Sequence, residues 1–71
     1  MQKNNIVFKN LKTTMANKEI TITDLANELG MNRETMSRKL SGISPLYTNE
    51  SFAIGKRLGD DVNYLFAELK E

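Results

Sequence analysis

Residues 25–42 carry the sequence LANELGMNRETMSRKLSG, in which two segments of helical composition are separated by Gly30 and closed by Gly42. Glycine enters the left-handed backbone conformation at the least cost, so Gly30 predicts the end of one helix and a sharp turn. Asn32 is a good N-cap for a second helix, and no helix-breaking residue follows it before Gly42. The stretch therefore predicts two short helices joined by a tight turn.

The residues that precede this stretch define where the first of the two helices begins. Thr21 followed three residues later by Asp24 is a variant of the capping box, with Asp where Glu or Gln is usual. The helix before the turn should therefore span about 22–29, and the helix after it about 33–41. Only Met36 and Leu40 give the later helix an apolar stripe, so most of its surface should face solvent.

Three further helices are expected from the same kinds of signal. One begins after residues 4–5 and frays near 17–18, one spans about 50–58 with Thr48 or Asn49 as its cap, and the last follows the cap Asp61. Their expected core residues are Phe8, Leu11 and Met15, then Ile54 and Leu58, then Val62, Leu65, Phe66 and Leu69. Because the one β-branched cluster, residues 20–23, has no partner strand, the sequence predicts a single all-α domain of five helices over residues 1–71.

Composition excludes several kinds of chemistry. Of the 71 residues, 39% are hydrophobic and 27% are charged, a balance typical of a soluble globular domain, and none is Cys or His. Zinc fingers, thiol nucleophiles and imidazole catalysis are therefore excluded. The adjacent Asp60 and Asp61 make a poor metal site because one of them is needed as a helix cap. We expect no enzyme, no cofactor and no metal.

Charge and hydropathy along the chain bear on its location and partners. The first residues lack the apolar core of a signal peptide, and no run approaches the roughly 18 apolar residues of a membrane span. We therefore expect a cytoplasmic protein without a membrane partner. Residues 1–57 hold nine Lys or Arg against five Asp or Glu, whereas residues 58–71 hold one against four. This asymmetry suits a basic face for a polyanion, although an ordinary solvated surface can also show it.

Two helices joined by a glycine turn and braced by further helices form the helix-turn-helix plan of DNA binding. Residues 25–42 resemble the helix-turn-helix of the phage Cro and repressor family, which has the five-helix lambda-repressor-like fold. The residues that carry the resemblance are Leu25, Ala26, Gly30, Asn32, Met36 and Gly42. A glycine between two helices alone is also compatible with a plain helical hairpin. The 12-residue interval between the two glycines and the helices that follow favour DNA binding.

The resemblance implies a transcription regulator from a bacteriophage or its bacterial host, which occupies a double-stranded DNA operator through a recognition helix in the major groove. The family's base-contacting positions are held here by Asn32, Arg33, Glu34 and Arg38, with Thr35 and Ser37 close to the backbone or thymine methyls. The implied phosphate and backbone contacts fall on Thr21, Thr23, Lys39 and Ser41. The chemistry agrees, because Arg can bind guanine bidentately, Glu can accept from cytosine, and Asn can pair with adenine. The plainer alternative is a solvated helix whose Glu34 and Arg38 form an i,i+4 pair worth about 0.3 kcal/mol.

Three departures from the family pattern stand out. Ile22 occupies a position where relatives commonly place a phosphate-binding Gln, and the loop 43–48 is uncharged where relatives often have Lys or Arg. We therefore expect weaker binding to the DNA backbone. Met15 and Leu40 fall where relatives often bury an Arg and Glu pair. Replacing both partners by apolar residues avoids the desolvation of a buried ion pair, so we expect Met15 to pack against Leu40.

The apolar residues of the last helix exceed what so small a core can bury, and this surplus predicts a homodimer on DNA, formed mainly through the last helix and the end of the one before it. The family resemblance also implies subunit contacts around residues 62–65. The expected interface residues are Val62, Tyr64, Leu65, Phe66 and Leu69. The alternative is that Phe66 and Leu69 fold back over Phe8 and Leu11 and complete the core of the monomer. A second function also stays open: an antirepressor or modulator that uses the same fold to bind another phage regulator, favoured by the exposed-looking apolar residues Ile43, Leu46 and Tyr47.

Overall fold

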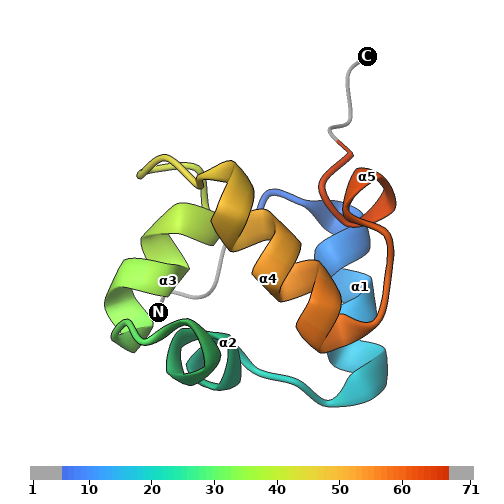
Figure 1. Ribbon diagram of the computed structural model, residues 1–71, viewed down its shortest axis with the longest axis horizontal. Coiled ribbons are helices and arrows are strands. Elements are labelled where there is room, and N and C mark those ends of the chain that lie inside the picture. The colour runs from blue at the N-terminus through green and yellow to red at the C-terminus, as the bar shows by residue number, and fades with distance from the viewer. Residues whose placement is uncertain (1–5, 68–71) are drawn as a thin grey trace.

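The computed structural model describes residues 6–67, which form five helices and no strand (Figure 1). The helices are α1 (Lys9–Lys18), α2 (Ile22–Leu29), α3 (Arg33–Leu40), α4 (Thr48–Leu58) and α5 (Val62–Leu65). The predicted all-α class is confirmed for this part of the chain. Leu69, which the sequence places in the last helix, lies outside the described residues. Within residues 6–67, no helix combines the length and the apolar character needed to cross a membrane.

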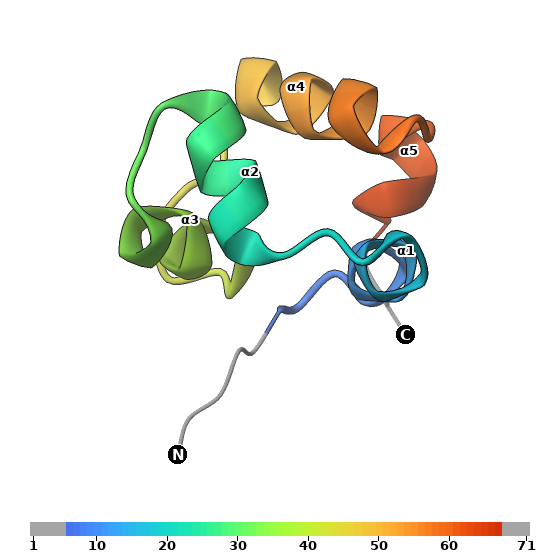
Figure 2. The same cartoon turned by 90° about the horizontal axis from the view of Figure 1, so that it is seen from below.

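Helix α4 packs against more of the other helices than any other helix of the described chain does. It packs against α1, α2 and α5, while α2 also packs against α3, and α1 against α5. Figure 1 shows α3 on one side of α4 and the pair α1 and α5 on the other, and Figure 2 shows α2 and α3 together, away from α1. The buried core contains Leu11, Met15, Ile22, Leu25, Ala26, Met36, Leu40, Ile54, Leu58 and Leu65. Every helix contributes to it, so the helices share one apolar interior.

The local signals around the glycine turn are confirmed. The Thr21 hydroxyl accepts from the backbone N–H of Asp24 at 3.1 Å, and the Asp24 carboxylate accepts from the Thr21 N–H at 2.9 Å. The hydrogen bond from the Thr21 backbone N–H to the carboxylate, together with the Thr21 side chain acting on the same carboxylate, lowers the pKa of Asp24. Gly30 ends α2 with φ 73°, and the Asn32 side-chain oxygen accepts from the Thr35 N–H at 2.8 Å. Both ends of the turn are therefore fixed by capping groups that can be identified in the sequence.

The first helix begins later than the sequence predicts. α1 starts at Lys9, because its N-cap Phe8 has an extended backbone and the Val7 N–H donates to the Leu40 carbonyl at 3.0 Å. This hydrogen bond ties the segment just before α1 to the end of α3. Met15 and Leu40 are both in the core, 4% and 0% exposed, although α1 and α3 are not among the helix pairs that pack directly. Direct packing of Met15 against Leu40 stays a prediction.

Two other helix ends differ from their predicted positions. Neither Thr48 nor Asn49 caps α4: the helix already includes Thr48, and its N-cap is Tyr47. The Glu50 carboxylate accepts from the backbone N–H of Tyr47 at 3.0 Å, which would otherwise lack a partner at the start of the helix. The helix therefore begins two residues earlier than predicted. Helix α5 ends at Leu65, with Phe66 as its C-cap, instead of continuing as the apolar pattern predicts.

Gly55 allows α5 to approach α4 closely, a role that no local sequence signal indicates. A Cβ at this position would lie 2.7 Å from Val62 Cγ1 and 3.1 Å from the Asp60 carbonyl oxygen. The first contact is with a side chain and the second with backbone, which cannot move without shifting the α4–α5 turn. The close packing of α5 therefore depends on the missing side chain.

We expect Gly55→Ala to destabilise the protein even though Ala is the better helix former. Helix propensity favours Ala over Gly by about 1 kcal/mol, whereas overpacking costs about 1–3 kcal/mol, so the expected net loss is about 1 kcal/mol. Urea denaturation followed by circular dichroism measures the change. A variant more stable than the wild type would show that the turn can move aside freely.

Candidate nucleic-acid interface

Helix α3 carries the predicted base-contacting residues and lies at the outer edge of the molecule (Figure 1). It packs against α2 across the Gly30 turn and buries Met36 and Leu40, which are both 0% exposed. Its other faces are open. Asn32, Arg33, Glu34 and Arg38 are exposed, while Thr35 and Ser37 are half-buried. The structure therefore brings the six predicted base-side residues together on one helix and its cap.

The side-chain amide of Asn32 is already hydrogen-bonded within the protein. Its side-chain oxygen is the acceptor that caps α3. Pairing with adenine uses both the oxygen and the nitrogen of an Asn amide. Asn32 would have to release the Thr35 N–H to make that bidentate contact, whereas its nitrogen can donate to a base or a phosphate without uncapping the helix.

Glu34 and Arg38 form the i,i+4 pair that the sequence left as an alternative. Arg38 Nη2 lies 2.8 Å from Glu34 Oε2, and the side chains are 56% and 72% exposed respectively. Exposed helix pairs contribute only about 0.3–0.5 kcal/mol, so this contact is easily exchanged for another. The pair therefore leaves a role in DNA contact open to both side chains.

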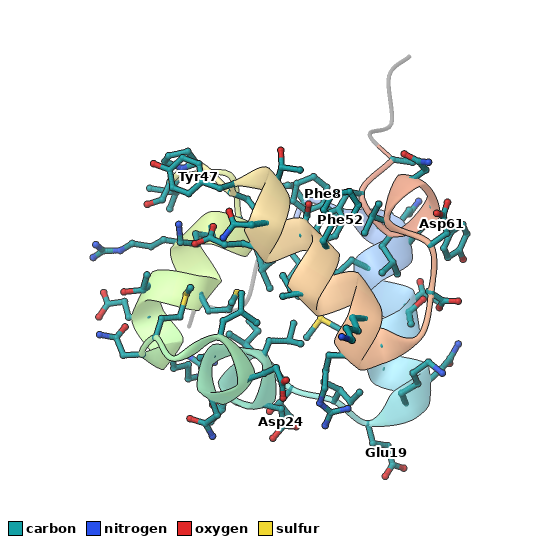
Figure 3. All side chains as sticks on the ribbon, in the orientation of Figure 1. Phe8, Glu19, Asp24, Tyr47, Phe52 and Asp61 are labelled. Carbon is teal, nitrogen blue, oxygen red and sulfur yellow. The ribbon has the colours of Figure 1, made fainter. Side chains whose placement is uncertain are left out.

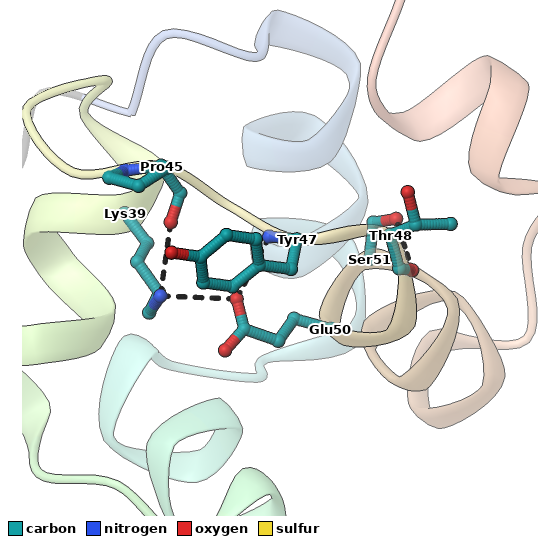
Figure 4. Close-up of polar contacts among 6 residues, drawn as sticks. All are labelled: Lys39, Pro45, Tyr47, Thr48, Glu50 and Ser51. Atoms are coloured by element: carbon teal, nitrogen blue, oxygen red, sulfur yellow. Dashed lines mark hydrogen bonds and ion pairs between the residues drawn. The ribbon is translucent and has the colours of Figure 1, made fainter.

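The four predicted backbone-contacting residues differ in their surroundings. Thr21 and Thr23 are exposed at the start of α2, and Ser41, half-buried, donates from its hydroxyl to the Arg38 carbonyl at 3.1 Å. Lys39 differs from these three because its side chain is only 10% exposed. Its ammonium donates to the Pro45 carbonyl at 3.0 Å and lies 3.1 Å from Glu50 Oε1 (Figure 4).

The Lys39 ammonium also lies under an aromatic ring, 4.8 Å from the ring centre of Tyr47. The ammonium is therefore bonded to a carbonyl and a carboxylate and lies against an aromatic ring. Because these contacts within the protein occupy it, Lys39 is not placed to bind a phosphate as the sequence predicts. No sequence pattern indicates this arrangement, because Glu50 lies on another helix and no local spacing links it to Lys39.

The carboxylate of Glu50 is held in its charged form by these neighbours. Burial acts to raise the pKa of Glu50, but the hydrogen bond from the Tyr47 N–H and the nearby Lys39 ammonium outweigh it and lower the pKa below its usual value. Among the described residues, no buried side-chain nitrogen or oxygen lacks a hydrogen-bond partner. The Lys39 ammonium is therefore bonded within the protein, to the Pro45 carbonyl and to Glu50 Oε1.

The predicted dimer residues of α5 mostly belong to the monomer instead. Leu65 is 0% exposed and lies in the core, which corrects its assignment to the interface. The Phe66 ring packs edge-to-face on Phe8, with ring centres 5.0 Å apart, as the alternative prediction has it. Val62 is half-buried and faces Gly55. Among the four described members of the predicted interface, Tyr64 alone is exposed, at 48%.

A second group of exposed apolar side chains lies away from α5. Ile43 and Tyr47, in the loop between α3 and α4, are 76% and 57% exposed, while Leu46 packs against the core. Figure 3 shows Tyr47 at the outer edge of the molecule, near the end of α3, and Phe52 on α4 is 57% exposed. Two of the three apolar loop residues predicted to be exposed are therefore exposed.

The described residues offer no metal centre, since no group of three or more Asp, Glu, His or Cys among residues 6–67 is placed to hold an ion. The geometry that distinguishes this surface is instead an outward-facing α3 with two arginines and a glutamate. No protein-family model matches the chain, and neither the curated proteins nor the solved structures contain a match to it.

Proposed function

We propose that this protein is a sequence-specific DNA-binding regulator of the phage Cro and repressor type, which occupies an operator through α3. The observation that carries the proposal is the exposure of Arg33, Glu34 and Arg38 on a helix whose opposite side is buried. An α-helix fits the major groove, which is about 12 Å wide. The resemblance of residues 25–42 to the helix-turn-helix family supports the same function.

The pair on α3 suggests how bases would be recognised. Guanine O6 and N7 can replace the Glu34 carboxylate as the acceptors of the Arg38 guanidinium, because the exposed pair is weak. Glu34 is then free to accept from a cytosine N4 amino group. Recognition would exchange one ion pair for two base contacts, so the operator should contain guanine and cytosine at neighbouring positions.

Backbone contacts should contribute less than in relatives with a cationic loop. With Lys39 committed to the fold, the remaining predicted backbone contacts are the hydroxyl groups of Thr21, Thr23 and Ser41. Hydroxyl groups release no counterions when they bind phosphate. Binding should therefore depend on salt less steeply than in a protein with several phosphate-bound lysines.

We expect Arg38→Ala and Arg33→Ala to weaken binding to a cognate duplex by about 1–3 kcal/mol each, or roughly 5- to 160-fold, with stability almost unchanged. The duplex is obtained by selection from a random library, and affinity is measured by gel-shift titration. Lys18→Ala, an exposed change on α1, serves as the control. Selection that enriches no sequence would contradict the proposal.

The exposed loop favours one other candidate, a protein that binds another regulator. Ile43 and Tyr47 offer an apolar surface beside α3. An apolar partner surface would release few counterions, so its binding would change little with salt, whereas DNA binding weakens as salt rises. Titration at two salt concentrations separates the two candidates.

A homodimer on DNA is part of the proposal in a narrower form than the sequence suggested. Leu65 and Phe66 are engaged within the monomer, so a two-fold contact through α5 would rest on Tyr64 and its neighbours. Half-sites one turn of the duplex apart would require the two copies of α3 to lie about 34 Å apart. Such a small contact favours association on a palindromic site over association in free solution.

A further inference from the structure

Helices α3 and α4 are linked by polar side chains. The α3 backbone comes close to α2, and to none of the other helices in the described part of the chain. Its first residues are held by the Gly30 turn and the Asn32 cap. Its last residues are held by the hydrogen bond from the Val7 N–H to the Leu40 carbonyl and by a polar cluster that consists of Lys39, Tyr47 and Glu50.

This polar cluster joins three segments at a single ammonium group. Lys39 projects from α3, Glu50 is in the first turn of α4, and the Pro45 carbonyl belongs to the loop between them (Figure 4). The loop is also closed onto α3, since the backbone N–H groups of Ile43 and Ser44 donate to the Arg38 carbonyl at 3.0 and 3.2 Å. The end of α3, the loop and the start of α4 therefore form one hydrogen-bonded unit.

Stability alone is a weak reason for a buried ion pair. Well-packed apolar residues of similar volume are often as stabilising, because the desolvation of two charges offsets their attraction. Unlike an apolar contact, the pair is directional, because the Lys39 ammonium must donate to a carbonyl and a carboxylate and lie against an aromatic ring at the same time. Such a set of contacts restricts the relative placement of the two helices more narrowly than apolar packing does.

We infer that Lys39, Glu50 and Tyr47 are positioning residues, which hold α3 at a defined angle to α4 and thereby align its outer face with DNA. The inference rests on the proposed DNA-binding function. The three side chains would not touch DNA themselves and would act through the placement of α3. Specific binding requires Arg33 and Arg38 to reach base edges together, whereas non-specific binding to phosphates tolerates a loosely held helix.

The variant Lys39→Met, Glu50→Gln tests the inference. It removes both charges, and the Gln oxygen can still accept from the Tyr47 N–H, so the cap of α4 is kept. The matched control is Arg57→Met, Glu28→Gln, which neutralises an exposed pair between α2 and α4 whose closest atoms are 3.8 Å apart. Both variants change the net charge equally, and circular dichroism establishes that each folds.

The first measurement needs no DNA. Because the chain has no Cys, the substitutions Glu34→Cys and Lys56→Cys introduce the only two sites for spin labels. Pulsed electron paramagnetic resonance then gives the distribution of distances between a label on α3 and a label on α4. We expect a distribution at least twice as broad in the Lys39 and Glu50 variant and an unchanged one in the control. An unchanged distribution in the Lys39 and Glu50 variant would overturn the inference.

The second measurement compares a selected duplex with a scrambled one across a series of salt concentrations. We expect specific affinity to fall about tenfold, with non-specific affinity and the slope against salt unchanged. If Lys39 instead bound phosphate, affinity for both duplexes would fall and the slope would decrease by about 1, which would overturn the inference. If the wild type showed no sequence preference while the distances broadened, the DNA-binding function would fail and the positioning cluster would stand.

Discussion

Leu40→Glu is expected to destabilise the protein by about 3–5 kcal/mol, because it places an unpaired charge inside the core. Leu40 is 0% exposed, and the neighbouring cation, Lys39, is already bonded to Glu50. Domains of this size are stable by only about 5–15 kcal/mol, so a large share of the molecules should unfold in mild denaturant. Urea denaturation followed by circular dichroism measures the loss.

Two companion variants show whether the charge itself is responsible. Leu40→Met keeps the volume and the apolar character and should cost less than about 1.5 kcal/mol. The double variant Met15→Arg, Leu40→Glu supplies a cation from α1 and should recover part of the loss if the two side chains meet. A double variant no more stable than Leu40→Glu would refute the prediction that Met15 packs against Leu40.

Leu65→Ala should cost about 2–5 kcal/mol, the range for a large apolar side chain deleted from a core. The reason is that Leu65 is fully buried within the monomer although its spacing in α5 suggested a dimer surface. Thermal melts at several protein concentrations distinguish burial within the monomer from burial in a dimer interface, because the stability of a dimer depends on concentration and that of a monomer does not.

The neighbouring Tyr64 provides the control for Leu65. It lies on the same helix and is 48% exposed, so Tyr64→Ala should change monomer stability much less. Sedimentation with a palindromic duplex then reports on association. A Leu65→Ala protein as stable as the wild type, which only fails to dimerise, would return Leu65 to the interface.

The sequence predicts the α2 and α3 region well because the signals there are local. Thr21 and Asp24 cap one helix, Gly30 ends it, and Asn32 starts the next, so each boundary depends on groups within three residues of it. The exposure of Arg33 and Arg38 follows from the narrow apolar stripe of α3. These features need no knowledge of the rest of the fold.

The features that the sequence did not predict depend on contacts between distant segments. A lysine on a polar helix is expected to point into solvent, and its burial at position 39 requires a carboxylate from α4. The role of Gly55 depends on Val62 and on the backbone at Asp60, which only the turn into α5 brings near. Similarly, an apolar stripe in α5 shows that Leu65 is buried without showing whether a second chain or the same chain covers it.

The position of Tyr47 over the Lys39 ammonium gives the protein an optical probe of its own. The chain contains no Trp and two Tyr, so its intrinsic ultraviolet fluorescence comes from Tyr47 and Tyr64. Tyr47 marks the junction of α3 and α4, and Tyr64 lies on α5. Replacing either tyrosine by phenylalanine leaves a single emitter, so events at the two ends of α4 can be recorded separately without an attached dye.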